Sequence, residues 1–146
     1  RRINDDMGKY VAENVIKSLI KVGKIINHSV VAVLGFTFKE NCQDTRNTKV
    51  IDIIHELSEY GVESLIIDDI ADADEASKLY NVQIKKMTDM KKVDAIVVSV
   101  QHDIFRNLGY DWFDQYFMDS NKVLFDLKGI YNRKEFEEKG YYYWRL

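Results

Sequence analysis

The hydrophobic residues of the chain first follow a helical period and then gather into short apolar runs. Apolar residues recur at steps of three and four over residues 3–26, which predicts one long amphipathic helix. Apolar runs then cover residues 30–34 and, interrupted only by Ser99, residues 95–100. Short runs of this kind are typical of strands that are buried on both faces of a sheet.

The rest of the chain alternates between predicted strands and predicted helices. Further strands are expected at 64–67, 82–84, 123–126 and 141–144, and helices at 49–60, 72–80, 102–107, 110–117 and 132–139. Because strands that alternate with helices pair in parallel, the pattern predicts an α/β fold with a doubly wound parallel sheet. We therefore divide the chain into a long helix, residues 1–27, and one sheet domain, residues 28–146.

A polar loop follows the first predicted strand. It begins at Gly35 and carries two cations, Lys39 and Arg46, before the next helix starts. Ligands of open α/β sheets bind at the carboxyl ends of the strands, where the amino end of a helix favours anions. Lys128 follows the fifth predicted strand and is expected at the same edge. The three cations predict a site for a phosphorylated ligand, and a solvated loop with ordinary surface charges stays open as the alternative.

Composition excludes several classes of function. The net charge of −3 gives no sign of a nucleic-acid-binding surface. No apolar run approaches the ~20 residues that cross a bilayer, so no membrane partner is expected. Cys42 is the single cysteine and has no metal-ligand spacing with the histidines, which predicts neither a disulfide nor a metal site and fits a cytoplasmic setting. The chain starts at Arg1 rather than Met, so we expect it to be a piece of a longer protein.

Other kinds of site fit the residues less well. A self-contained dinucleotide site needs three glycines after the first strand, where the chain has only Gly35. A phospho-acceptor receiver carries its acidic pair after the first strand, whereas Asp68 and Asp69 follow the second. Cys42 has no predicted histidine partner and is expected to be an incidental thiol, and the histidines, His102 included, are expected on the surface or on helix faces. A non-enzymatic receiver-like or ligand-binding module stays open as the alternative to an enzyme.

Several separated segments carry recognisable motifs. In chain order they are RRIND at 1–5, GFTFKEN at 35–41, DTRNTKV at 44–50, FDLKGIY at 125–131 and YWRL at 143–146. Together they resemble the C-terminal portion of the UDP-glucose/GDP-mannose dehydrogenase family, in particular its bacterial UDP-N-acetylhexosamine 6-dehydrogenases. The resemblance covers essentially the whole chain.

The resemblance implies an NAD-dependent enzyme that oxidises the C6 hydroxyl of a UDP-sugar to a carboxylate for surface polysaccharide synthesis. In such enzymes an N-terminal Rossmann domain binds NAD and carries the catalytic cysteine, and a long helix leads into a Rossmann-like domain that binds the nucleotide sugar. This chain resembles the helix and the second domain. Phe38, Lys39 and Lys128 match positions that contact the UDP-sugar, and Arg46 matches an arginine that reaches NAD across the cleft. Residues 3–26 match the helix through which family subunits form dimers.

Two departures from the family pattern limit what the resemblance implies. Asp68-Asp69 stands where relatives usually have Asp-Pro, which alters one turn. The Gly-Gly-x-Cys loop of the family is absent, so Cys42 does not inherit the role of the nucleophile. We therefore expect no catalytic residue in this chain and no activity from it alone. Its expected partners are a UDP-sugar, the N-terminal domain that binds most of the NAD, and a second copy of the chain.

Overall fold

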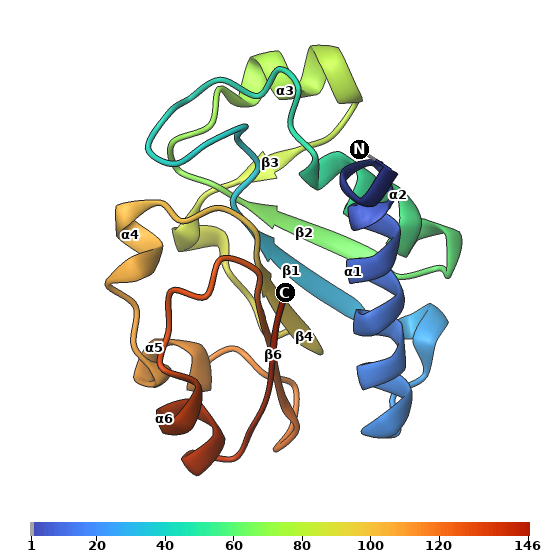
Figure 1. Cartoon of the computed structure of the whole chain (residues 1–146), viewed down its shortest axis with the longest axis vertical. Coiled ribbons are helices and arrows are strands. Elements are labelled where there is room, and N and C mark those ends of the chain that lie inside the picture. Colours follow the sequence, from blue (N-terminus) through green and yellow to red (C-terminus); the bar gives the residue numbers. More distant parts are fainter. Residues whose placement is uncertain (1) are drawn as a thin grey trace.

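The computed structural model describes residues 2–146, with side chains from Asp6 onward, and shows helices on both faces of one sheet (Figure 1). The strands are β1 (Val30–Leu34), β2 (Glu63–Ile67), β3 (Ile84–Lys85), β4 (Ala95–Val98), β5 (Lys122–Asp126) and β6 (Tyr141–Arg145). The α-helices are α1 (Arg2–Lys21), α2 (Val50–Glu59), α3 (Ala73–Tyr80), α4 (Asp103–Arg106), α5 (Tyr110–Asp114) and α6 (Arg133–Glu138). Short 3₁₀ helices are η1 (Ile26–His28) and η2 (Met87–Asp89).

The sheet has the strand order β3-β2-β1-β4-β5-β6, and all neighbouring strands pair in parallel. This is the order of the Rossmann fold, so the predicted doubly wound α/β architecture is confirmed. The direction of winding reverses between β1 and β4. Loops that leave these two strands therefore diverge to opposite faces, and the space between them is where such sheets bind ligands.

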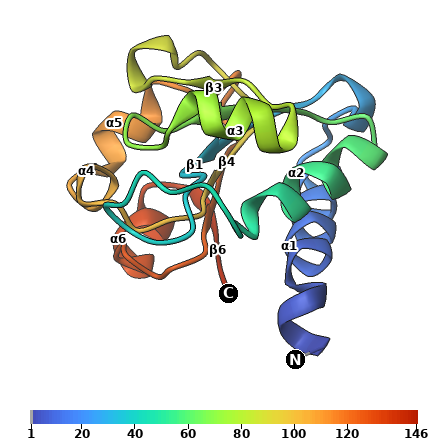
Figure 2. The ribbon, with the colours of Figure 1, turned by 90° about the horizontal axis from the view of Figure 1, so that it is seen from above.

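Alternate residues of the central strands face two separate hydrophobic clusters. Val31 and Val33 of β1 pack toward α1 and α2, whereas Ala32 and Leu34 pack toward the aromatic side of α4, α5 and α6. Figure 2 shows these two groups of helices on opposite sides of the sheet. The continuous apolar run in the sequence follows from this arrangement, because both faces of the strand are buried.

The long helix ends earlier than its apolar period predicts. α1 stops at Lys21 because Gly23 adopts a left-handed conformation, with φ of +82°. The amide of Gly23 donates to the carbonyl of Ile20 and that of Lys24 to the carbonyl of Leu19, which is the hydrogen-bond pattern of a Schellman C-cap. The predicted period continued to residue 26 because side chains beyond the helix also pack against the core.

Three other elements differ from their predicted bounds by two residues or more, and the rest by one residue at most at either end. The strand expected at 95–100 ends at Val98, so Ser99 and Val100 lie in the loop beyond it. The helix expected at 110–117 ends at Asp114, and the strand expected at 82–84 is displaced to Ile84–Lys85. Among the described residues, no helix is both long and apolar enough to span a membrane.

Candidate functional site

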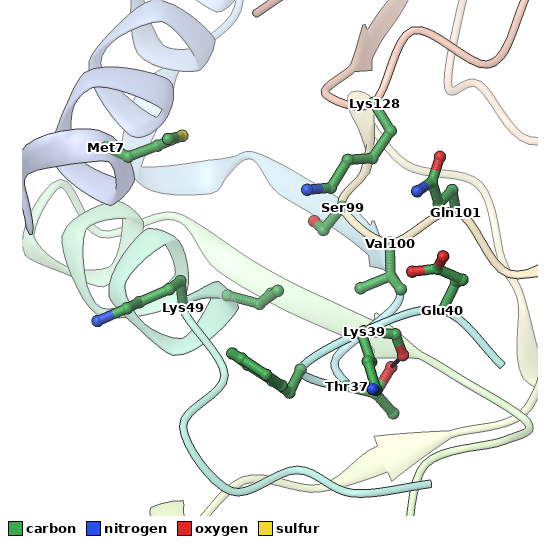
Figure 3. A pocket seen from close by; sticks show the side chains of 11 residues that line it. Met7, Thr37, Lys39, Glu40, Lys49, Ser99, Val100, Gln101 and Lys128 are labelled. Carbon is green, nitrogen blue, oxygen red and sulfur yellow. Dashed lines mark hydrogen bonds between the residues drawn. The ribbon is translucent and has the colours of Figure 1, made fainter. Parts of the chain in front are cut away.

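A cavity of about 400 Å³ lies at the carboxyl ends of β1, β4 and β5 (Figure 3). Lys39 enters it from the loop after β1, Ser99 from the end of β4 and Lys128 from the loop after β5. Because β4 lies between β1 and β5 in the sheet, Ser99 lies between the two loops that carry the lysines. Lys39 and Lys128 thus line one cavity, although the ammonium group of Lys39 points away from that of Lys128 in Figure 3; that the two lysines hold one ligand stays a prediction.

The cavity offers both positive charge and an exposed aromatic ring. Phe38 lines it with 57% of its surface exposed, so this ring is not committed to the core. Lys49, at the start of α2, also lines the cavity, although its ammonium group points away from the other lysines in Figure 3. Within the described part of the chain, neither Lys39 nor Lys128 forms an ion pair. Glu40 also lines the cavity, but the lysines there outnumber it, so the cavity favours an anionic ligand.

The loop that carries Lys39 begins with a close approach between two backbone segments. Gly35 has φ of +99°, and a Cβ atom there would lie 2.7 Å from the Cβ of Val100. Only glycine fits this conformation and this contact. Farther along, the hydroxyl of Thr37 donates to the carbonyl of Lys39 at 2.8 Å, which closes a tight turn around the lysine. The backbone at Lys39 is therefore fixed on both sides of the residue.

His102 holds the loop that carries Lys39 through a hydrogen bond. Its ring is fully buried, and its Nδ1 accepts a hydrogen bond from the amide of Asn41 at 2.9 Å. Because Nδ1 is the acceptor, we assign the ring proton to Nε2, which donates to Asp68 Oδ2 at 3.0 Å. The expectation that the histidines lie on the surface or on helix faces is wrong for His102. A lone histidine in sequence gives no sign of such burial.

Asp68 accepts several hydrogen bonds at this edge of the sheet. Its carboxylate accepts from His102 and from the amides of Phe36, Ile70 and Ala71. Burial alone would raise the pKa of Asp68, but these donors, His102 foremost, outweigh it and lower that pKa. The carboxylate is fully occupied in holding the loops.

The loop that carries Lys128 depends on a second buried carboxylate. Asp126, at the end of β5, accepts hydrogen bonds from the amides of Ile130 and Tyr131 and from the hydroxyl of Tyr143. These three donors fix the turn in which Lys128 lies. The sequence signal for this role is an acidic residue that directly follows the apolar run of β5.

Arg46 lies outside the cavity, so the prediction that three cations face one ligand is wrong for this residue. Its guanidinium binds Asp44 through Nε and Nη2, at 3.0 and 2.9 Å, and the whole side chain is 69% exposed. The loop turns away here because Thr45 is tied to α3: its amide and hydroxyl both donate to Glu75, and its carbonyl accepts from the hydroxyl of Tyr80. The hydrogen bonds from Arg46 lower the pKa of Asp44 to about 2.

The remaining reactive groups are Cys42 and the residue types that bind metals. Cys42 is a half-buried free thiol. Across the residues that the structure describes, no three histidine, cysteine or acidic side chains are grouped so as to hold a metal ion.

Comparison with known proteins identifies the family of this chain. Residues 32–133 match the sequence profile of the UDP-glucose/GDP-mannose dehydrogenase family, UDP binding domain. The chain is 44% identical over 135 residues to Protein CapL of Staphylococcus aureus, covering 92% of this chain and 31% of CapL. It is 42% identical over 130 residues to the UDP-N-acetyl-D-glucosamine 6-dehydrogenase of Salmonella typhi, covering 89% of this chain and 30% of that enzyme.

A solved structure agrees with this match. The NDP-N-acetyl-D-galactosaminuronic acid dehydrogenase of Methanosarcina mazei Go1 superposes with a TM-score of 0.87 and 26% identity, over all of this chain and 30% of that one. The chain thus spans about a third of the length of these relatives. With a family profile that covers most of its length, this chain belongs to the UDP-glucose/GDP-mannose dehydrogenase family, and residues 32–133 are its UDP binding domain.

Proposed function

We propose that this chain is the nucleotide-sugar-binding C-terminal part of an NAD-dependent UDP-sugar 6-dehydrogenase of the cytoplasm. The observation that carries the proposal is the shared cavity of Lys39 and Lys128 at the winding reversal of a UDP binding domain. Curated relatives that match it over most of its length include a UDP-N-acetyl-D-glucosamine 6-dehydrogenase. The product of such a reaction is a sugar acid of the kind that surface polysaccharides contain.

In this proposal the two lysines hold the diphosphate of the UDP-sugar. An ammonium group is a compact charge with three donors and no acceptor, which suits the acceptor-rich oxygens of a diphosphate. Phe38 offers an exposed ring at the cavity for packing against the apolar face of the base or sugar. Each charge-assisted contact contributes on the order of 1.5–3 kcal/mol.

The turn after β1 does not form a dinucleotide cradle. The glycine after β1 is packed against Val100, and the next amide, that of Phe36, already donates to Asp68. No run of free amides therefore remains at the turn where a pyrophosphate would bind. We accordingly propose that NAD and the catalytic cysteine belong to an N-terminal domain, and that Arg46, exposed on the loop, contacts NAD across the cleft.

The first helix also has a place in this proposal. Tyr10 and Ile20 of α1 are 54% and 60% exposed, although the opposite side of the helix packs on α2. We propose that these two exposed side chains, which lie among exposed lysines, pack on the N-terminal domain or on a second copy of the chain, which makes α1 the central and dimer-forming helix of the enzyme. Sedimentation of the chain over a range of concentrations separates self-association from a requirement for the other domain.

Calorimetric titration of the 146-residue chain with UDP tests the binding proposal. Lys39→Ala and Lys128→Ala are each expected to weaken binding of UDP by about tenfold or more, because each loses a charge-assisted contact. Lys134→Ala is the control, because Lys134 is an exposed lysine on α6, away from the cavity. Equal affinity of both cavity variants and the unaltered chain would refute the proposal. Formation of NADH from a UDP-sugar by this chain alone would refute the division of labour between domains.

A further inference from the structure

The hydroxyl of Ser99 is buried at the cavity and makes no hydrogen bond. Ser99 is only 5% exposed, and its Oγ finds no partner among the described residues. A buried hydroxyl without a partner costs free energy, and native structures keep few of them. Because Ser99 also lines the cavity, a ligand bound there can supply the missing partner.

The position of Ser99 is fixed by the sheet on both sides. Its amide donates to the carbonyl of Leu34 in β1 at 2.8 Å, and the carbonyl of the preceding Val98 accepts from the amide of Leu127 at 3.1 Å. The residue therefore stands between the loop of Lys39 and the loop of Lys128, as β4 stands between β1 and β5. Figure 3 shows the side chains of Ser99 and Lys128 extending in the same direction into the cavity.

The flanking charges decide which part of a ligand reaches Ser99. Ammonium groups of Lys39 and Lys128 attract the most negative part of a nucleotide sugar, which is its diphosphate. A hydroxyl can accept from an ammonium group while it donates its own proton to an anionic oxygen. We infer that the Ser99 hydroxyl is a direct contact of a diphosphate oxygen, between the two lysines; this inference rests on the proposed function.

Affinity for UDP and resistance to urea, both measured on Ser99→Ala, distinguish a ligand contact from a structural role. If Ser99 contacts the diphosphate, the variant binds UDP about tenfold or more weakly, because a hydrogen bond to a charged group is lost. Its resistance to urea is expected to stay equal or to rise, because an unpaired buried hydroxyl has been removed. A hydroxyl that merely supports the fold predicts lower resistance to urea instead.

Ser64 provides a matched control. It is the other buried serine hydroxyl that lacks a partner in the described part of the chain, but it lies near the amino end of β2 and away from the cavity. Ser64→Ala is expected to leave the affinity for UDP unchanged. A loss of affinity in Ser64→Ala equal to that in Ser99→Ala would overturn the inference.

Inorganic pyrophosphate shows which part of the nucleotide is contacted. Equal factors of weakening for UDP and for pyrophosphate in Ser99→Ala support contact with the diphosphate. Weaker binding of UDP with unchanged binding of pyrophosphate would place Ser99 at the nucleoside and overturn the inference. Unchanged affinity for both, while Lys39→Ala still weakens UDP binding, would overturn the role of Ser99 and leave the proposed function standing. Absence of UDP binding by the unaltered chain would overturn both.

Discussion

Asp68 and His102 form a buried hydrogen bond of 3.0 Å across the end of a strand to which neither belongs. Asp68 follows β2 and His102 lies beyond β4, while β1 runs between those strands in the sheet. The loop that leaves β1 is held by both residues, because the amide of Phe36 donates to Asp68 and that of Asn41 donates to His102. This pair therefore fixes the stretch of chain that carries Lys39.

Replacement of His102 by phenylalanine tests this role. His102→Phe keeps a buried ring but removes a donor to Asp68 and the acceptor for the amide of Asn41. Because buried groups are left unpaired, we expect the free energy of unfolding to fall by about 1–3 kcal/mol. Urea denaturation measures this change, and faster hydrogen exchange at the amide of Asn41 is expected beside it. His55→Phe is the control, because His55 is exposed on α2, and its effect is expected to stay within about 0.5 kcal/mol.

The sequence predicted that the two lysines lie at one edge of the sheet, because this placement follows from strand order. Apolar runs identify the strands, parallel pairing places their carboxyl ends at one edge, and Lys39 and Lys128 follow two such ends. No side-chain contact with another element is needed for this step. The same pattern also predicted the α/β fold with nearly every element in place.

What the sequence did not reveal depends on contacts between distant residues. Arg46 turns away from the cavity because Thr45 is bound to α3, 30 residues farther along the chain. The burial of His102 depends on its hydrogen bond to Asp68, which follows β2. The hydroxyl of Ser99 is unpaired at the cavity because β4 ends one residue earlier, at Val98. None of these contacts has a periodicity or a local motif that sequence patterns record.

Arg46 and Asp44 give a prediction for acid pH. The pKa of Asp44 is lowered to about 2 by the side chain and the backbone amide of Arg46. Its ordinary value is 3.8, so the contribution of this pair to stability is present above pH 3.8 and is lost as the pH falls through about 2. In Arg46→Ala the pKa of Asp44 is expected to rise partway toward 3.8, because only the amide remains as a donor. Titration of the Asp44 carboxyl by NMR measures this shift.

Lys78 provides the control for this titration. Lys78 lines the same surface depression as Arg46 but forms no hydrogen bond with Asp44. Lys78→Ala is therefore expected to leave the pKa of Asp44 at about 2. A pKa of Asp44 that stays at this value in Arg46→Ala would show that the guanidinium is not its partner in solution.

Tyr143 supports the loop of Lys128 from the neighbouring strand. Burial and its hydrogen bond to Asp126 raise the pKa of the Tyr143 hydroxyl to about 12. Tyr143→Phe is expected to lower the free energy of unfolding by about 0.5–1.5 kcal/mol, because Asp126 keeps only its two amide donors. Tyr142→Phe is the control, since the adjacent hydroxyl of Tyr142 makes no hydrogen bond with Asp126.

The raised pKa of Tyr143 also predicts a response to alkaline pH. Its contribution to stability is complete below the ordinary pKa of 10 and is lost as the pH rises through about 12. Urea denaturation at pH 9 and at about pH 11.5 should therefore show a smaller difference between the unaltered chain and Tyr143→Phe at the higher pH. A difference that does not shrink would mean that the hydroxyl of Tyr143 does not depend on its proton to hold Asp126.

Replacement of Gly35 tests the close approach of the ends of β1 and β4, on which both sides of the cavity depend. In Gly35→Ala the new Cβ atom would lie 2.7 Å from the Cβ and 2.9 Å from the amide nitrogen of Val100, at φ of +99°. Backbone atoms of two strand ends must then separate, and overpacking of this kind costs about 1–3 kcal/mol, to which the strained backbone adds. We expect a loss of that size in urea denaturation. Affinity for UDP should fall as well, because Lys39 lies four residues after this glycine and Ser99 directly precedes Val100.

Gly109→Ala separates this effect from the general cost of replacing a glycine. Gly109 has φ of −102°, and a Cβ atom there would have no neighbour within 4 Å. Its replacement is expected to cost at most about 1 kcal/mol, as the N-cap residue of a short helix, and to leave the affinity for UDP unchanged. If Gly35→Ala proved as stable as Gly109→Ala and bound UDP equally well, the ends of β1 and β4 would not be held together as the structure shows. The lysine and the serine would then lack the fixed spacing that a diphosphate site requires.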